Sequence, residues 1–534
     1  MRRLIRRRLP TPPTHAGRTV SVSANADNSL VARNAFAGYL AWIANLGIGL
    51  VVTPILLHHL GVEGFGVWTL SVTISGYVGM VELGLGVATV RQIAAALAVG
   101  DRLGASVVAA SARALYALLG LVGMVLLAGL VMIPRLIAFT GRAHSGQMRL
   151  AVLILGFGYL LSLATSIYPT LAVAAGRGDI GVAVGLTSRL LMTAAQIAVV
   201  LVSANIVALS LVTAAGGVCG TLAVRYVTRH VLRDIEVRLA LASRRTARQL
   251  LASGWRNAAI VVAAAVALQS DVIIVGAVIG AAAVTTYGIA VRAASVAIDL
   301  ATRPTDVLVP TFAHAGALDD HKRITNALSE SILLARAVLV GALIAFVFFG
   351  DSLLKLWLGK VPGNANTVLV ILALGAVLSA PGHSCFVLLS GIGRLNYLLA
   401  GASLAAVGNL GLSILLTWQL GVVGPALGTL VAVAIWDLLL LPRYVGQFLN
   451  VPWHSISAAG VRVLAVPALA ASVTAWVLRH GLDWENPREG LAATLIIGLV
   501  YGGAMVLAFG HERRTRYLRV TRGAVGRVSR PRAL

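Results

Sequence analysis

The sequence predicts an all-α polytopic membrane protein with about 14 transmembrane helices. Its 534 residues are 58% hydrophobic and only 12% charged, and the mean hydropathy is +0.89. Soluble globular proteins do not have this composition. Apolar runs follow one another along the chain, each close to the roughly 20 residues that a helix needs to cross a bilayer. Arginines gather between these runs, as they do in loops on the inner side of a membrane.

The expected spans are the apolar runs themselves, with ends that sequence alone places to within about 2–4 residues. They are 34–57, 65–90, 107–133, 150–172, 183–203, 208–227, 256–276, 286–310, 332–350, 366–390, 397–418, 423–446, 458–478 and 490–510.

Lysine and arginine counts predict which side each loop faces. With the N-terminus inside, 32 of the 43 Lys and Arg residues fall in inside segments and 7 in outside segments. Arg177 and Arg189 are counted among the inside ones. Because loops on the cytoplasmic side are enriched in Lys and Arg, we expect both termini in the cytoplasm. The expected location is the cytoplasmic (inner) membrane, with the basic tails against anionic lipids.

Several landmarks recur at a nearly constant spacing. Gly61 resembles Gly280, and Asp101 resembles Asp320, each 219 residues later. The spacing predicts two six-helix lobes related by a pseudo-two-fold axis along the membrane normal, with two extra C-terminal helices. The expected division is a basic cytoplasmic tail (1–32), an N-lobe of spans 1–6 (33–227), a linker with a cytoplasmic amphipathic helix (228–255), a C-lobe of spans 7–12 (256–446), spans 13–14 (447–511) and a second basic tail (512–534).

One predicted span carries four formal charges on a single face. At 100° per residue, Arg292, Asp299, Arg303 and Asp306 lie within about 60° of one another. Each would cost about 2.5–3.5 kcal/mol if it faced lipid. We therefore expect this face to look toward other helices or into a wet cavity. Two interpretations stay open: internal pairs of Arg303 with its two acidic neighbours, or a functional charged cleft.

Two further charges complete the candidate site. Asp271 and Arg292 stand about equally far from the turn at Gly280, so they lie at similar depth and predict a buried ion pair. The repeat spacing carries Glu82 to within two residues of Asp299, on a face without arginine. We expect Glu82 to bind a proton or another ion, or else to be a structural carboxylate that is hydrogen-bonded locally.

The sequence gives little sign of chemistry beyond these charges. Cys219 and Cys385 both lie in apolar runs and are expected to be core residues. The histidines show no zinc-binding spacing, and no Gly-rich phosphate loop of the form G-x-x-x-x-G-K-[ST] is present. We therefore expect no catalytic residues, metal or cofactor. The arginines lie between membrane spans, which indicates topology rather than nucleic-acid binding.

Four stretches carry a resemblance to a known family. They are 60–68 (LGVEGFGVW), 82–91 (ELGLGVATVR), 270–276 (SDVIIVG) and 287–292 (YGIAVR). In this order they resemble the polysaccharide/oligosaccharide flippases of the multidrug/oligosaccharidyl-lipid/polysaccharide exporter superfamily, over about residues 33–445. Glu82 stands where that family more often has Asp, which keeps the charge.

The resemblance implies two lobes around a central cleft that opens alternately to each side. It implies export of a polyprenyl-diphosphate-linked oligosaccharide for cell-surface polysaccharide, such as lipopolysaccharide or exopolysaccharide, with a polysaccharide polymerase as a possible partner. Arginine binds phosphate bidentately, which fits Arg292 and Arg303. Without an ATP site, a proton or sodium gradient or the substrate gradient would supply the energy.

Three alternatives remain at this point. An ion-coupled multidrug exporter of the same superfamily predicts a cleft of carboxylates and aromatic residues without arginine. A membrane-embedded glycan polymerase or ligase predicts a large outer loop with catalytic Arg or His. A scaffold or a lipid-II-type flippase is the third.

Overall fold

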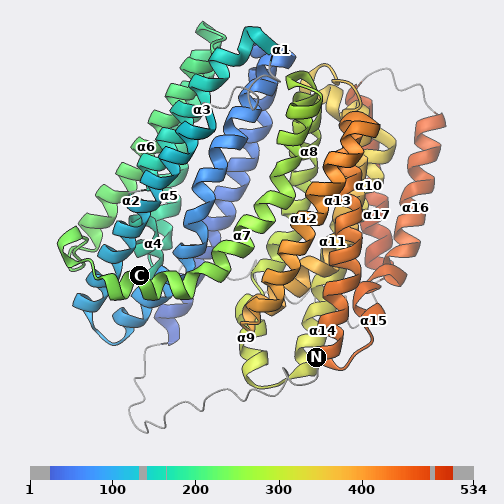
Figure 1. Cartoon of the computed structure of the whole chain (residues 1–534). Coiled ribbons are helices and arrows are strands. Elements are labelled where there is room, and N and C mark those ends of the chain that lie inside the picture. Colours follow the sequence, from blue (N-terminus) through green and yellow to red (C-terminus); the bar gives the residue numbers. More distant parts are fainter. Residues whose placement is uncertain (1–23, 132–140, 164, 482–486, 509–534) are drawn as a thin grey trace, which may run out of the picture.

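The computed structural model describes residues 24–131, 141–163, 165–481 and 487–508. These residues form helices and short connections, with no strand among them (Figure 1). The prediction of an all-α membrane protein is confirmed.

The first lobe contains six helices and is called the N-lobe. Its long first helix is broken at Gly61, which has a φ of 70° that residues other than glycine rarely adopt. The predicted fourth span is divided into two helices. The six are α1 (Ala24–Ala98), α2 (Arg102–Val131), α3 (Gly141–Leu163), α4 (Ile167–Ala174), α5 (Gly178–Val202) and α6 (Ile206–Val231).

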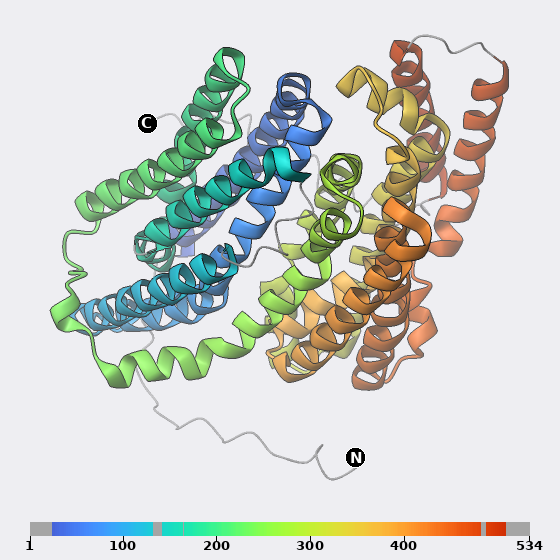
Figure 2. The ribbon, with the colours of Figure 1, turned by 45° about the horizontal axis from the view of Figure 1, so that its top comes forward.

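Helix α7 (Arg244–Val278) connects the lobes. Its first turns lie across the foot of the N-lobe before the helix rises between the lobes (Figure 2). Leu250 belongs to the core of the N-lobe, whereas Ile260 belongs to the core of the second lobe. The expected linker helix is therefore continuous with span 7. We call this end of the bundle the linker end and the opposite end, at Gly61, the far end.

The second lobe, the C-lobe, begins at the far end with α8. Two helices, α16 and α17, follow the lobe and pack on α10 through Ile344, Phe349, Ala471, Ala493 and Ile497. The helices are α8 (Ala281–Asp306), α9 (Val309–Ala317), α10 (His321–Leu358), α11 (Ala365–Gly391), α12 (Leu395–Leu420), α13 (Gly424–Ile435), a π-helical turn (Trp436–Leu440), α14 (Leu441–Leu449), α15 (Trp453–Ser457), α16 (Val461–Gly481) and α17 (Pro487–Ala508).

The number of membrane spans agrees with the sequence. The described chain has 12 apolar stretches long enough to cross a bilayer, and two of them are 41 and 55 residues long, from Ala37 to Tyr77 and from Leu395 to Leu449. Each of these two changes direction at a glycine with positive φ, Gly61 or Gly421. Each therefore holds parts of two spans, which gives about fourteen in total.

The turns repeat between the lobes. Asp101 Oδ1 accepts a hydrogen bond from the Gly104 N–H at 2.7 Å, and Asp320 Oδ1 accepts one from the Arg323 N–H at 3.0 Å. Each aspartate thus caps a helix start 219 residues from its counterpart. Residues with positive φ also fall at corresponding turns, namely Gly61 and Gly280, Gly100 and Asp319, and Gly176 and Gly393. The predicted repeat is confirmed.

The lobes share one hydrophobic core only at the far end. That core joins Phe65 and Trp68 of α1 to Val275, Val284 and other residues of α7, α8, α10 and α11. At the linker end, the N-lobe and the C-lobe each pack around a core of their own, and α7 contributes to both. The space between the lobes is therefore closed at the far end and open toward the linker end.

Two hydrogen bonds cross between the lobes on the far side of this space. The Trp357 indole donates to the Leu50 carbonyl at 2.7 Å. That carbonyl lacks its usual partner in α1 because Pro54, four residues on, has no N–H. The Thr285 hydroxyl donates to the Val62 carbonyl at 2.5 Å, just after the break at Gly61.

Closure of the far end predicts the effect of a methyl group at Gly66. A Cβ there would overlap the carbonyl oxygen of Ala281, whereas one at Gly76 of the same helix would meet nothing. Overpacking of this kind costs about 1–3 kcal/mol, or a factor of about 5–150 in an equilibrium. We expect Gly66→Ala to open the far end, seen as faster maleimide labelling of a Val284→Cys reporter in a chain without its native cysteines. Equal labelling rates in Gly66→Ala and the control Gly76→Ala would contradict this.

Candidate functional site

A cavity of about 480 Å³ lies between the lobes, bounded by α1, α5, α8 and α10. Its wall combines charged groups with tryptophan and small polar residues. The lining residues that bear on function are Trp42, Asn45, Arg292, Ser295, Asp299, Arg303 and Trp357.

The charged face of α8 forms one wall of this cavity. Arg292, Asp299 and Arg303 all line it. Asp306 instead accepts a hydrogen bond from His383 Nε2 of α11 at 3.1 Å. Among the ion pairs of the described residues, none joins the charges of this face to one another. Of the two open interpretations, the internal pairs of Arg303 with Asp299 and Asp306 are therefore not formed in this structure.

Arg292 reaches from the C-lobe to the N-lobe. Its Nη1 lies 3.5 Å from the Thr53 hydroxyl of α1, and its guanidinium lies 6.0 Å from the centre of the Phe65 ring. Among the described residues only the Thr53 hydroxyl lies within hydrogen-bonding distance, so most of its five N–H donors are free there, and the side chain is exposed to the cavity. Arg292 is therefore held in position and still able to bind an anion.

Arg189 lines a cavity, although the lysine and arginine count placed it in a loop on the inner side. It lies 11 residues into α5, about 16 Å along the helix axis. It lines a second cavity of about 420 Å³ between α3, α5 and α6, and its charge repels that of Arg292. Apolar residues on both sides of Arg189 were the signal that could have placed it within a span.

Asp271 does not pair with Arg292, contrary to prediction. It is 2% exposed, and its Oδ2 accepts hydrogen bonds from the Tyr287 hydroxyl at 2.8 Å and the Thr429 hydroxyl at 2.7 Å. The two residues do lie on neighbouring helices, but Asp271 turns into the C-lobe and Arg292 toward the N-lobe. Equal depth along a helix does not fix which way a side chain points.

A polar network continues from Asp271 across the C-lobe. Asn409 Nδ2 donates to Thr429 Oγ1 at 2.9 Å, and the Ser413 hydroxyl donates to Asn409 Oδ1 at 3.0 Å. Ser413 Oγ also lies 3.5 Å from the carbonyl oxygen of Pro425. The second oxygen of Asp271 is buried with no hydrogen-bond partner among the described residues. These oxygens could hold a proton or a small hard cation. Polar residues spaced four apart within apolar spans were the sequence pattern that could have indicated this network.

Glu82 belongs to α1, but its side chain lies outside the residues that the structure describes. Its predicted role in ion coupling therefore stays a prediction.

Two other span charges have visible surroundings. Arg336 of α10 is buried and donates to the Ala459 carbonyl at 2.8 Å, so it ties α10 to the start of α16. Asp437 lies in the π-helical turn and packs against Gly382, where a Cβ would overlap it. Neither residue lines the cavity between the lobes.

The fold and the cavity together define a class of protein. Two lobes of membrane helices related by a pseudo-two-fold axis, with a charged cavity between them, are an architecture that two-lobed membrane transporters have. The family described as "Polysaccharide biosynthesis protein" matches residues 31–316, more than half of the sequence, and the chain belongs to this family.

Solved structures of transporters share this fold. The lipid II flippase MurJ in an inward closed conformation is 12% identical, with a TM-score of 0.67 over 89% of this chain and 98% of that one. A multidrug resistance MATE family transporter of the MOP superfamily in an inward-facing conformation is 17% identical, with a TM-score of 0.64 over 76% and 95%. An outward-facing structure of such a transporter is 16% identical, with a TM-score of 0.59 over 81% and 96%. The chain matches no curated protein in sequence.

The hydrogen bonds of Asp271 predict which residues it depends on. In a double-mutant cycle on the free energy of unfolding, Asp271→Ala and Thr429→Ala should be coupled by about 1.5–3 kcal/mol, because hydrogen bonds to charged groups are worth this much. Asp271→Ala and Arg292→Ala share no partner and should be additive within about 0.5 kcal/mol. Coupling of Asp271 to Arg292 with none to Thr429 would show that the described arrangement is wrong.

Proposed function

We propose that the protein is a flippase that exports a polyprenyl-diphosphate-linked oligosaccharide across the cytoplasmic membrane. The observation that carries the proposal is the cavity between the lobes, which presents Arg292 and Arg303 from the C-lobe. Arg189 of the N-lobe lines a neighbouring cavity and is near enough to repel the charge of Arg292. In this account the protein catalyses no covalent reaction, and its work is to move the lipid head group between leaflets.

A diphosphate suits the charges of this cavity. Arg189 and Arg292 repel each other, and an anion between them would turn this repulsion into two attractions. Guanidinium groups bind phosphate bidentately, so two of them can hold both phosphates of the lipid. The negative charge of Asp299, which lines the same cavity, weakens the binding of the anion. Binding must be weak enough for the anion to be released.

The rest of the lining suits a sugar. Trp42 and Trp357 offer broad apolar rings, and Asn45 and Ser295 offer hydrogen-bonding groups. An organic cation, which a multidrug exporter would carry, would meet Arg292 and Arg303 in this cavity. The charges therefore favour the glycan lipid over the multidrug alternative.

The direction of transport follows if the linker end is cytoplasmic. The arginine-rich segment from Arg225 to Arg256 lies there, as the enrichment of inner loops in Lys and Arg predicts. The cavity then accepts its substrate from the cytoplasmic leaflet, and separation of α1 from α8 at the far end releases it on the other side. The exported glycan would supply a cell-surface polysaccharide and the polymerase that assembles it.

A proton or sodium ion would drive this cycle at one of two carboxylates. The network around Asp271 joins α7, α8, α12 and α13 inside the C-lobe, and one oxygen of Asp271 has no hydrogen-bond partner there. An ion bound there would change how these four helices pack. Glu82 in α1 is the second candidate, from its sequence position.

Charge reversal in the cavity tests the substrate. Arg292→Glu should abolish export, because it places repulsion where an anion must bind, and Arg292→Lys should retain part of it, since Lys keeps the charge but loses bidentate geometry. The measurement is the appearance of glycan lipid in the outer leaflet of vesicles with an imposed proton gradient.

The matched control is Arg149→Glu, which makes the same charge change at an exposed position of α3 outside this cavity. Full transport by Arg292→Glu, or equal loss in Arg149→Glu, would refute an anion-binding role for Arg292.

Neutral substitutions of the two carboxylates test the coupling. Asp271→Asn keeps the size of the side chain and removes its charge, so transport should lose most of its response to an imposed proton or sodium gradient. The same gradients applied to Glu82→Gln show whether α1 carries the coupling instead. Unchanged gradient responses in both variants would remove both residues from the coupling mechanism.

A further inference from the structure

A third cavity, which is polar and measures about 640 Å³, lies at the linker end of the C-lobe. It is bounded by the bend of α7, the start of α12 and α14. The cavity between the lobes is bounded by other helices, so this is a separate site. Its lining residues are Arg256, Gly393, Arg394, Leu395, Asn396, Tyr397 and Tyr444.

Aromatic rings hold one of its arginines in place. The Arg394 guanidinium lies 4.1 Å from the centre of the Phe448 ring, and its Nη1 lies 3.4 Å from the Tyr444 hydroxyl. Tyr444 in turn stacks on Tyr397, with ring centres 3.5 Å apart and an angle of 8° between the rings. Arg394 thus loses little freedom on binding and keeps most of its donors available.

Arg256 faces the same cavity from α7. Its guanidinium lies 5.0 Å from the ring of Trp255. None of the ion pairs formed by the described residues involves Arg256 or Arg394. The cavity therefore holds two positive charges from two helices with no carboxylate to neutralise them, and it suits an anion.

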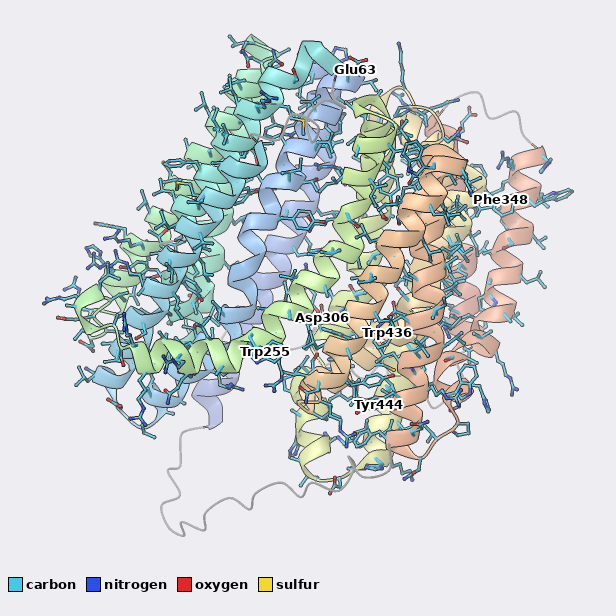
Figure 3. The ribbon with its side chains drawn as sticks, in the orientation of Figure 1. Glu63, Trp255, Asp306, Phe348, Trp436 and Tyr444 are labelled. Atoms are coloured by element: carbon cyan, nitrogen blue, oxygen red, sulfur yellow. The ribbon has the colours of Figure 1, made fainter. Side chains whose placement is uncertain are left out.

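Trp255 indicates the level of this cavity in the membrane. It is 48% exposed and lies near the bend where α7 turns from lying across the bundle to crossing it (Figure 3). Figure 3 places Trp255, Trp436 and Tyr444 toward the same end of the molecule. Tryptophan and tyrosine gather at the level of the lipid head groups, so this is the level at which lipid phosphates are expected.

We propose that this cavity binds the phosphate of an anionic phospholipid, held by Arg256 and Arg394 together. The lipid ties the bend of α7 to α12 and α14. The site takes a lipid of the surrounding leaflet rather than the transported substrate, because it shares no lining residue with the cavity between the lobes.

Native mass spectrometry of the full chain tests the proposal. Protein extracted from vesicles of phosphatidylglycerol and phosphatidylethanolamine should retain phosphatidylglycerol. Arg256→Gln with Arg394→Gln should lower that retention about tenfold or more, because charge-assisted hydrogen bonds are lost. Arg443→Gln removes an exposed arginine of α14 outside the cavity and should retain the lipid as the parent chain does.

A milder variant keeps the test open if the double variant does not fold. Tyr444→Phe removes only the hydroxyl that positions Arg394 and should lower retention by a smaller factor. Retention unchanged in both the double variant and Tyr444→Phe would overturn the proposal, as would equal retention of phosphatidylethanolamine. A rise in melting temperature with inorganic phosphate as large as that with phosphatidylglycerol would overturn the assignment to a lipid.

Discussion

The close contact of α1 with α8 at the far end is the constraint on which the rest of the structure depends. Gly66 lets the two backbones approach so closely that no Cβ fits between them. On the other side of the break at Gly61, the Trp357 indole donates to the Leu50 carbonyl, which Pro54 leaves without a helical partner. Because the lobes are joined there, they can separate only at the linker end, and that separation creates the cavity.

The cavity explains why one membrane span can carry several charged residues. Several charges within one membrane span are tolerated only where they meet protein or water. Arg292, Asp299 and Arg303 meet the space between the lobes, and Arg189 lines a separate cavity inside the N-lobe. The same separation of the lobes thus leaves these charges in a cavity, while Asp271 stays apart in the interior of the C-lobe.

Much of this could be predicted from the sequence, for identifiable reasons. Apolar length gave the spans, the 100° rotation per residue placed Arg292, Asp299 and Arg303 on one face, and glycine and aspartate at turns revealed the repeat. The partners of Asp271 could not be predicted, because they depend on how α7 and α13 are rotated against each other. Arg189 was misplaced because counting charges by loop ignores where a helix begins.

The central claim is that the cavity carries a diphosphate-linked glycan lipid between leaflets. Its most direct test is reconstitution of the purified full chain in vesicles with a fluorescent polyprenyl-diphosphate disaccharide and with a fluorescent phosphatidylethanolamine. We expect the protein to speed movement of the diphosphate lipid to the opposite leaflet and to leave the phosphatidylethanolamine unaffected. Movement no faster than in protein-free vesicles, or equal movement of both lipids, would contradict the account.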